Sequence, residues 1–325
     1  MSDVLSTHKV EICPVVVEKH PNADTLGVVK IYGYSCVVKI SDWKEGMLGA
    51  YIPPDSLVDT TRPEFIFLTK PGEQFIRIRA KKLRGIQSFG LLIPAPENTK
   101  IGDNVAGQLG VTHYEPPELT TGGQSEKAPP HLSGLSAFDV DSMRRYNSIL
   151  QEGEPVIVTE KIHGASSRYC FTDGRIYVGS RNEWKKYDPK NMFWKALYPE
   201  LEQFCKDHKG FIVYGEVYGE VKGFRYGCTK GQVKFAAFDL LTPDHHWENA
   251  KATRLLLQSV SQVPLLGEIP FSFDAVCALA EGASTMLGAD HIREGCVVKP
   301  LIERWNEEIG RVCLKVVGAG YLEKK

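Results

Sequence analysis

Lys161 is the residue of this sequence whose type and surroundings most directly suggest chemistry. It follows the β-branched run Val156–Thr159 and precedes a turn that contains Gly164. A lysine amine is a nucleophile only without its proton, and with an unperturbed pKa of about 10.4 only about 0.1% of it is free near neutral pH. Burial and nearby cations lower that pKa, and a value near ~8 raises the free fraction a few hundredfold. The position therefore predicts an activated amine, although a lysine at the surface end of a strand is the alternative.

Two further lysines are candidates for the positive charge near that amine. Lys299 ends the segment Glu294–Lys299, and Lys315 follows it near the end of the sequence. Such cations would also neutralise charge on a phosphate while its leaving group departs, and positioning and electrostatics dominate that kind of catalysis. We therefore expect Lys161, Lys299 and Lys315 to form the catalytic group.

Two glutamates beside glycines are candidates for a metal site. Glu216 follows the apolar run Phe211–Tyr214, which is typical of a buried strand, and Glu294 precedes the similar run Val297–Val298. Hard divalent cations that are held by few carboxylates and by nucleotide phosphates are Mg²⁺ or Mn²⁺. A carboxylate at a strand end beside a glycine can approach a ligand closely, and a solvated loop charge is the alternative for either glutamate.

Lys161 opens a series of short motifs that follow one another in a fixed order. They are Glu160-Lys161-Ile162-His163-Gly164, Ser180-Arg181-Asn182, Tyr214-Gly215-Glu216, Phe235-Ala236-Ala237-Phe238-Asp239, Glu294-Gly295-Cys296-Val297-Val298-Lys299 and Leu314-Lys315. As an ordered set they resemble the covalent nucleotidyltransferases, the superfamily of polynucleotide ligases and mRNA capping enzymes. The resemblance covers residues 138–322. His163 stands where DNA ligases and capping enzymes usually have aspartate, and in this the sequence resembles the RNA ligases.

The resemblance implies that Lys161 carries AMP on a phosphoramide bond. It also implies that adenine stacks between Phe238 and Val297, a contact of about 1–3 kcal/mol; Phe235 is the rival aromatic, and an ordinary core phenylalanine is the alternative. Glu216 would hold the ribose or a metal-bound water, and Glu294 would help to place the catalytic Mg²⁺ or Mn²⁺. Arg181 would contact the ribose or the end being joined. The expected ATP-binding residues are Glu160, Ile162, Arg181, Glu216, Phe238 and Val297.

Two positions of the motif series have less certain roles. His163 is a candidate for substrate contact, either by hydrogen bonding to the backbone or ribose or in catalysis. Many relatives carry Lys-x-Lys in the last motif, whereas Lys315 is followed here by Val316 and Val317. Lys299 is the candidate to fill the role of the missing second lysine.

The residues before the motif series are rich in short strands. From Val10 to Thr112, apolar runs alternate with turn residues at intervals that are typical of a small barrel. The stretch Lys19–Leu26 resembles the opening of tRNA-binding OB-fold modules, and is also a plausible turn before a strand. Residues 1–113 resemble the OB domain that precedes the catalytic domain in RNA ligases of the Deinococcus and Naegleria type. DNA ligases and capping enzymes have a C-terminal OB domain instead, for which the sequence leaves no room.

A basic segment lies within this region, over residues 77–85. Its cations alternate with apolar residues, so one face of a strand would be basic and could follow a phosphate backbone. A solvated strand face is the alternative. Together with Asn182, the expected RNA-binding residues are Arg77, Arg79, Lys81, Lys82 and Arg84.

The expected fold class is α+β, with three parts. An all-β OB barrel spans residues 1–113, and the Pro-, Gly- and Ser/Thr-rich residues 114–137 form a flexible linker. Residues 138–325 form a nucleotidyltransferase domain, the ATP-grasp-like adenylation domain of ligases, with antiparallel sheets and flanking helices. Apolar spacing predicts helices over 192–208, 249–260 and 274–283.

Composition excludes several classes of protein. The net charge of −1 gives no global attraction for nucleic acid, so RNA would bind to local patches. Eight scattered cysteines without a Cys-x-x-Cys pair argue against zinc and favour buried thiols in a reducing compartment. No signal peptide or transmembrane run is present, so we expect an intracellular, cytoplasmic monomer without a membrane partner.

The sequence thus favours an ATP-dependent RNA ligase that joins a 3′-hydroxyl to a 5′-phosphate through lysyl-AMP and an adenylated 5′ end. The expected cofactors are ATP and Mg²⁺ or Mn²⁺, and the expected substrate is nicked duplex RNA in need of repair. The alternatives are a DNA ligase, a capping enzyme, and an RNA-binding module with a decayed ligase domain. Retention of Lys161, Glu216, Glu294 and Lys315 argues against decay.

Overall fold

The computed structural model describes residues 8–114, 124–132, 140–220 and 223–324, which form two compact units. The first, here the N-terminal unit, comprises Met1–Pro116, Met143–Asn147 and Leu322–Lys325. The second, the C-terminal unit, comprises Pro117–Ser142 and Ser148–Tyr321. Two short segments of the predicted catalytic domain are thus part of the N-terminal unit.

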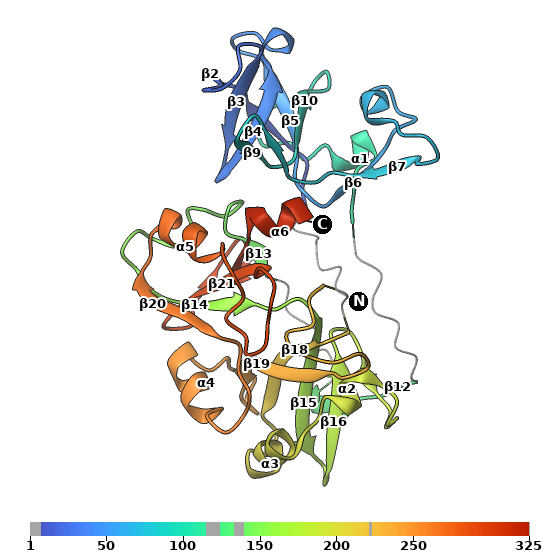
Figure 1. Ribbon diagram of the computed structural model, residues 1–325, viewed down its shortest axis with the longest axis vertical. Helices are drawn as coiled ribbons and strands as arrows, with labels where there is room; N and C mark the ends of the chain where they lie inside the picture. The colour runs from blue at the N-terminus through green and yellow to red at the C-terminus, as the bar shows by residue number, and fades with distance from the viewer. Residues whose placement is uncertain (1–7, 115–123, 133–139, 221–222, 325) are drawn as a thin grey trace. The chain divides into compact units, whose positions relative to one another are not determined.

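The N-terminal unit is built from short antiparallel strands, drawn in blue to cyan in Figure 1. Its cores are two clusters of buried aliphatic and aromatic side chains, one around Val58 and Phe65 and one around Val29 and Tyr51. Three of its sheets have three strands and the fourth has two. The sheets are β1-β5-β10 (Glu11–Pro14, Leu48–Ile52, Leu91–Pro94), β2-β3-β4 (Val17–Lys19, Leu26–Ile31, Tyr34–Lys39), β11-β6-β7 (Thr112–His113, Ser56–Asp59, Phe75–Arg77) and β8-β9 (Lys81–Leu83, Ile86–Ser88), with the helix α1 at Ala106–Leu109.

The basic segment is not one strand, which corrects the prediction for residues 77–85. Arg77 ends β7, whereas β8 pairs with β9 in a separate hairpin. The chain leaves β7 where Ile78 is buried in the cluster around Val58 and Ala80 in the cluster around Val29. After β8, Arg84 and Gly85 have φ of +50° and +93°, the conformation that closes a two-residue hairpin. Strand β8 therefore turns back on β9 instead of continuing β7, and the cations do not share one strand face.

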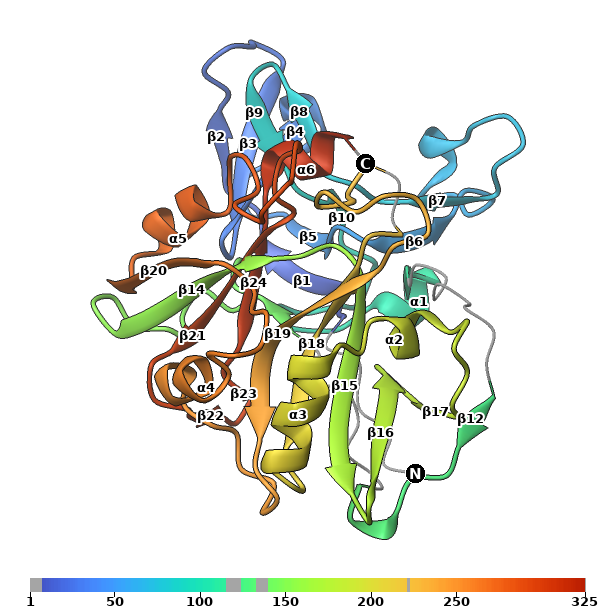
Figure 2. The same cartoon turned by 60° about the horizontal axis from the view of Figure 1, so that its bottom comes forward.

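Two larger sheets make up most of the C-terminal unit, and the views of Figures 1 and 2 separate them. The first has the order β12-β17-β16-β15-β18-β19, with β12 Ser125–Glu126, β17 Trp184–Lys185, β16 Arg175–Ser180, β15 Ala165–Thr172, β18 Ile212–Tyr218 and β19 Lys234–Leu241. The second has the order β13-β24-β21-β14-β20, with β13 Asp141–Ser142, β24 Leu314–Val317, β21 Gly295–Pro300, β14 Pro155–Lys161 and β20 Leu265–Pro270. The small hairpin β22–β23 pairs Trp305–Asn306 with Gly310–Arg311.

Short helices accompany these sheets. They are α2 Met192–Lys195, α3 Pro199–Asp207, α4 Ala250–Leu256, α5 Phe273–Leu279 and α6 Ala319–Lys324. The single helix predicted over residues 192–208 is wrong, because it is broken between α2 and α3. Tyr198 has φ −124° and ψ 162°, the extended conformation that a residue before proline prefers, and Pro199 then begins α3.

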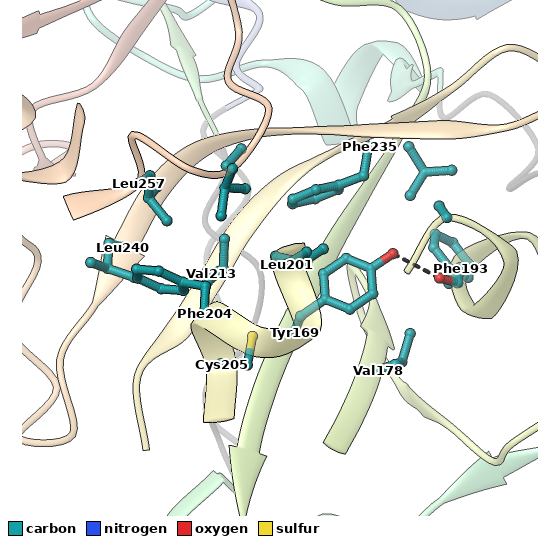
Figure 3. Packing of buried hydrophobic residues seen from close by; sticks show 14 of the residues in the cluster. Tyr169, Val178, Phe193, Leu201, Phe204, Cys205, Val213, Phe235, Leu240 and Leu257 are labelled. Carbon is teal, nitrogen blue, oxygen red and sulfur yellow. Dashed lines mark hydrogen bonds between the residues drawn. The ribbon is translucent and has the colours of Figure 1, made fainter. Parts of the chain in front are cut away.

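The six-stranded sheet and α3 share a hydrophobic core, shown in Figure 3. Leu201, Phe204 and Cys205 of α3 are buried against residues of β15, β18 and β19. The hydroxyl of Tyr169 donates a hydrogen bond of 2.7 Å to the Phe193 carbonyl oxygen within this core. The apolar face of α3 is therefore packed against the sheet, and the buried Tyr169 hydroxyl has a hydrogen-bond partner. This core gives β15, β18 and β19 a rigid support.

The predicted linker is only partly described, since residues 115–123 and 133–137 lie outside the described residues. Its described part contains β12, which pairs with β17, and a 3₁₀ turn at Pro130–Leu132. Those residues are therefore structured parts of the C-terminal unit. The domain boundaries 1–113 and 138–325 stay a prediction.

All eight cysteines lie in the described part of the chain and are free thiols, and seven of them are buried. Burial raises the pKa of Cys170 to about 12. Such protonated thiols behave as small apolar core residues.

Candidate active site

Strand pairing brings the predicted motif residues onto one face of the five-stranded sheet. On β14 and β21, Lys161 lies opposite Gly295 and Ile157 lies opposite Lys299. Between these pairs, Val297 lies opposite Lys315 of β24. Paired residues of a sheet point to the same face, as does every second residue along a strand. Lys161, Val297, Lys299 and Lys315 therefore share a face, here called the lysine face, although they are far apart in the sequence.

The motif glycines are needed because the backbone of another strand passes close by. A Cβ atom on Gly164 would lie 2.1 Å from the Val217 carbonyl oxygen, and one on Gly295 would lie 2.0 Å from the Val316 carbonyl oxygen. No side chain fits at such distances. The two glycines thus let the strands converge around Lys161.

Lys161 is held by a carboxylate and not by cations. Its Nζ lies 3.0 Å from Glu294 Oε1. Burial favours the neutral amine, but Glu294 and Glu216 outweigh it and raise the pKa of Lys161 above its ordinary value. The expectation that Lys299 and Lys315 lower this pKa is therefore wrong for the ligand-free protein, in which the nearest charges are negative.

The two glutamates differ in protonation. Burial raises the pKa of Glu216 to about 8, and the neighbouring Glu294 adds to that effect while Lys161 opposes it. Burial acts in the same direction on Glu294, but Lys161 and His163 outweigh it and hold its pKa at about 2. One carboxylate therefore pairs with Lys161, and the other is kept largely neutral near pH 7.

The two carboxylates fit a divalent cation. Glu294 Oε2 is buried and, apart from His163 Nδ1 at 3.3 Å, has no polar partner among the residues that the structure describes, so this oxygen can accept a further ligand. Within those same residues, no group of three or more His, Cys, Asp or Glu side chains could hold a metal ion by itself. This donor set suits an ion that takes few protein ligands and completes its shell with phosphates and water, as Mg²⁺ does.

His163 lies beside Glu294 in a cage of aromatic rings. Its backbone N–H donates to the Tyr226 hydroxyl at 2.7 Å, and its Nδ1 lies 3.0 Å from the Tyr321 hydroxyl. The same Nδ1 is 3.3 Å from Glu294 Oε2. His163 therefore contacts the residues that surround the nucleophile.

Lys299 belongs to a buried charge network that sequence patterns only partly indicated. Its Nζ donates to Asp239 Oδ1 at 2.5 Å, and Asp239 also accepts two hydrogen bonds from Arg311, of 2.9 and 3.0 Å. Arg311 in turn bonds Glu303 and lies over the Trp247 ring at 4.0 Å. Asp239 stands in a quoted motif, whereas Arg311 lies between motifs and carried no local signal.

The two candidates for the aromatic stacking residue are separated by burial. Phe235 is 1% exposed, packs edge-on against Tyr169 at 4.8 Å between ring centroids, and belongs to the core of Figure 3. Phe238 is only partly buried, and its carbonyl oxygen accepts a 3.3 Å bond from Lys299. The backbone of Phe238 therefore contacts Lys299, whereas Phe235 is an ordinary core residue.

Two predicted ATP-binding residues have side chains that are engaged elsewhere. Glu160 is 1% exposed, and its carboxylate accepts hydrogen bonds from Ser284 Oγ at 2.5 Å and from both the N–H and Oγ1 of Thr285 at 2.7 Å. It precedes Lys161 in β14 and so points to the opposite face. Ile162 is a buried core residue. Any contact of these two with a nucleotide would come from their backbone.

The predicted RNA-binding cations differ in exposure and in whether they already have a partner. Arg77 is already paired, with bonds of 2.9 and 2.6 Å to Asp55 Oδ1 and its guanidinium 4.1 Å from the Tyr114 ring centroid. Lys81, Lys82 and Arg84 are exposed on the β8–β9 hairpin. Arg79 is in the segment between β7 and β8, and Arg181 and Asn182 are exposed after β16.

The stretch that resembles tRNA-binding modules has a structural role in holding this hairpin. His20 is 1% exposed, and its Nε2 lies 3.2 Å from the Leu83 carbonyl oxygen. Asn22 Nδ2 donates to the Arg84 carbonyl oxygen at 2.9 Å. These bonds fix the turn that carries Arg84.

The fold and this arrangement can be compared with those of known proteins. A family model described as RNA ligase matches residues 154–317, half of the chain, and a model of an OB-fold domain matches residues 9–95. The chain belongs to the RNA ligase family. The family match covers β14 to β24 and with them Lys161, Glu216, Glu294 and Lys315, and the OB-fold match covers most of the N-terminal unit.

Solved structures of Naegleria gruberi RNA ligase have the same fold. A mutant of the R4a ligase without ligand has a TM-score of 0.81 at 23% identity, covering 98% of this chain and 99% of that one. Mutants of the Naegleria ligase with ATP and Mn, and with AMP and Mn, have TM-scores of 0.79 and 0.80 at 23% and 24% identity, covering 97% and 98% of this chain and 98% and 99% of theirs. The predicted fold class, an OB domain followed by an α+β ligase domain, is confirmed. A search of curated protein sequences finds no match.

In the part of the chain that the structure describes, no helix is both long and apolar enough to cross a membrane.

Proposed function

We propose that this RNA ligase family member uses ATP to join RNA ends through a covalent lysyl-AMP intermediate on Lys161. The observation that carries the proposal is the placement of Lys161 Nζ 3.0 Å from Glu294, on one sheet face with Lys299 and Lys315. Attack of the free amine on the α-phosphorus of ATP forms the P–N bond and breaks the bond to pyrophosphate. The AMP then passes to a 5′-phosphate, and an RNA 3′-hydroxyl displaces it to seal the strand.

Glu294 and Glu216 would hold the divalent cation, for which Mn²⁺ or Mg²⁺ is the proposed ion. When bound, such an ion supplies positive charge near the phosphates and takes up the carboxylate charge that now stabilises the Lys161 ammonium. Lys161 itself stays protonated until that charge is withdrawn, because both neighbouring carboxylates raise its pKa. The protein therefore keeps its nucleophile inactive while nucleotide and metal are absent.

The proposed roles of the remaining residues come from the family resemblance, and their positions support them. Phe238 and Val297 would sandwich adenine, with Val297 on the lysine face and Phe238 beside Lys299. Lys315 would neutralise the α-phosphate. Lys299 is bonded to Asp239. It would neutralise the α-phosphate only if that phosphate competes with the Asp239 carboxylate. The exposed Arg181 and Asn182, together with Arg79, Lys81, Lys82 and Arg84, would contact RNA, and nicked duplex RNA is the proposed substrate.

Intact mass spectrometry tests the covalent step. We expect the wild-type protein, stripped with pyrophosphate and incubated with ATP and Mn²⁺, to gain the mass of one AMP, and Lys161→Ala to gain none. Lys206→Ala removes an exposed lysine of α3 that pairs with Glu202 and should behave as wild type. An adduct that survives in Lys161→Ala, or its absence from wild type with both Mn²⁺ and Mg²⁺, would sink the proposal.

A further inference from the structure

Residues 183–195, directly after the Ser180-Arg181-Asn182 motif, combine an exposed aromatic side chain with exposed lysines. Tyr187 is 74% exposed. It is nevertheless held in place, because its ring packs against Trp194 of α2 at 5.0 Å between ring centroids, with 83° between the ring planes. Trp194 is itself fixed, since its Nε1 donates a hydrogen bond of 3.2 Å to the Lys185 carbonyl oxygen. The fold thus positions the Tyr187 side chain and leaves most of it open to solvent.

Two lysines next to this tyrosine in the chain have no carboxylate partner. Lys186 and Lys190 are exposed, and neither forms an ion pair in the part of the chain that the structure describes. Lys186 Nζ instead donates to the neutral amide oxygen of Gln124 at 3.0 Å. Lys185, by contrast, is paired with Glu183 at 2.7 Å. In a chain whose net charge is −1, two uncompensated cations beside one exposed ring make a local attraction for an anion.

A hollow of about 430 Å³ lies at this place, lined by Gln124, Lys186, Tyr187 and Asp188. The loop is shaped by its own bonds, since Asp188 Oδ1 accepts the N–H of Lys190 at 2.8 Å. An aromatic ring, an amide and a carboxylate are groups that stack on a nucleobase and bond its edge. The carboxylate repels a phosphate inside the hollow, whereas the two lysines attract phosphates beside it. The lining therefore suits a base between two phosphates better than it suits a phosphate alone.

Strand pairing links this surface to the candidate active site. Ser180, at the end of β16, pairs with Ser167, and Ser167 pairs with Gly215, the neighbour of Glu216. From β16 the chain turns into β17, next to the β12 edge of the same sheet, as Figure 2 shows. Three strand spacings separate β18 from β17, which is about 14 Å. A few nucleotides of RNA span that distance, so a strand whose end lies at Glu216 can reach Tyr187.

We propose that the hollow beside Tyr187 binds an unpaired base of the RNA, stacked on the tyrosine ring, while Lys186 and Lys190 bind the flanking phosphates. Aromatic side chains among cations bind single strands in this way. A base inside a duplex is covered on both faces by its neighbours and cannot stack on the ring. The C-terminal unit thereby holds a single-stranded segment a few nucleotides from the end to be joined. The inference rests on the proposed function in one respect, that the substrate is RNA.

Fluorescence anisotropy with a labelled single-stranded RNA and with a fully paired RNA duplex of the same length tests this site. We expect Tyr187→Ala to weaken single-strand binding about tenfold, as is typical when a base loses its aromatic partner, and to leave duplex binding unchanged. Tyr187→Phe keeps the ring and should bind as wild type. The slope of log affinity against log salt should stay the same in Tyr187→Ala. In Lys186→Ala/Lys190→Ala it should become shallower by about 0.7 for each lysine.

Trp305→Ala is the matched control. It removes an aromatic side chain of the same unit that is 70% exposed, from a hairpin that carries Glu307 and Glu308, and should bind both RNAs as wild type. Unchanged single-strand binding in Tyr187→Ala, or an equal loss for the single strand and the duplex, overturns the proposal. Wild-type protein that binds single-stranded RNA through Tyr187 but takes no AMP from ATP overturns the proposed function alone.

Discussion

The charges around Lys161 determine when its amine can react. Two glutamates raise its pKa, so in the ligand-free protein the amine is a protonated partner of Glu294. A buried nucleophile that was free at all times could be acylated or otherwise consumed by other electrophiles. Here its activation depends on the same ligands that the reaction requires, since charge must be drawn away from the carboxylates before the proton leaves.

Ionisation of the buried Glu216 side chain destabilises the folded protein. This effect should be visible in the pH dependence of the free energy of unfolding. Its pKa is raised from 4.5 to about 8 in the folded protein, so the unfolded chain loses this proton first, and stability is lost as pH rises from about 4.5 to about 8. Glu216→Gln cannot ionise. We expect its free energy of unfolding, relative to wild type, to rise by about 1–3 kcal/mol between pH 5 and pH 8.5, in denaturant titrations.

The exposed Glu220→Gln is the control for this measurement and should show no such trend. A difference between Glu216→Gln and wild type that stays flat across the pH range would contradict the raised pKa. The variant should also lose the AMP adduct, which would make Glu216 a residue that lowers stability in favour of function.

At the scale of elements, one carboxylate links the two sheets of the C-terminal unit. Asp239 lies on β19 of the six-stranded sheet, Lys299 on β21 of the five-stranded sheet and Arg311 on the β22–β23 hairpin. Lys299, Asp239 and Arg311 are each 7% exposed or less. Burial disfavours ionised Asp239, but Arg311 and Lys299 outweigh it and lower its pKa. The network therefore fixes how the sheets meet beside the lysine face.

Asp239→Asn should destabilise the protein strongly, because it leaves two buried cations without their shared anion. We expect a loss of about 3–5 kcal/mol in urea unfolding, the range found when one partner of a buried ion pair is removed. Asp244→Asn, an exposed aspartate in the turn after the same strand, should change stability by less than about 0.5 kcal/mol. A loss for Asp239→Asn no larger than that of the control would show that the network contributes little.

At the scale of the whole molecule, the attraction of RNA depends on local basic surfaces and not on the net charge. The net charge is −1, so RNA is not attracted by the protein's overall field and must find basic surfaces. The β8–β9 hairpin is one such surface, with Lys81, Lys82 and Arg84 exposed and its turn braced by His20 and Asn22. The hairpin belongs to the N-terminal unit, whereas the residues proposed for nucleotide chemistry belong to the C-terminal unit.

Replacing Lys81 and Arg84 by alanine should weaken RNA binding without disturbing adenylylation of the protein. We expect RNA affinity to fall about tenfold near 0.1 M salt, and the slope of log affinity against log salt to become shallower by about 0.7 for each cation removed. The AMP adduct should form as in wild type. Fluorescence anisotropy over a salt series measures both quantities.

The double variant Lys206→Ala/Lys209→Ala removes two exposed lysines of the C-terminal unit instead and should leave the slope unchanged. Equal losses for the two double variants would mean that RNA binds by diffuse charge and not at the hairpin.

The family and the candidate residues of the site could be predicted from sequence patterns. Lys161, Glu216, Glu294 and Lys315 were found because each stands beside a local signal, a glycine or a strand end, and because the motifs occur in order. Strand spacing and turn residues predicted a small barrel, and the family resemblance then implied the OB domain and the α+β class. Local patterns suffice for such features because strand alternation and turn chemistry are properties of neighbouring residues.

Only the tertiary structure decided which charges meet. It paired Lys161 with Glu294 and Lys299 with Asp239, moved Arg77 into a bond with Asp55, and brought Tyr321 to His163. It also divided the basic segment at a hairpin and broke the long helix before Pro199. A pKa and an ion pair depend on distances across a fold, and those distances are set by strand register and packing between residues that can be more than a hundred positions apart in the chain.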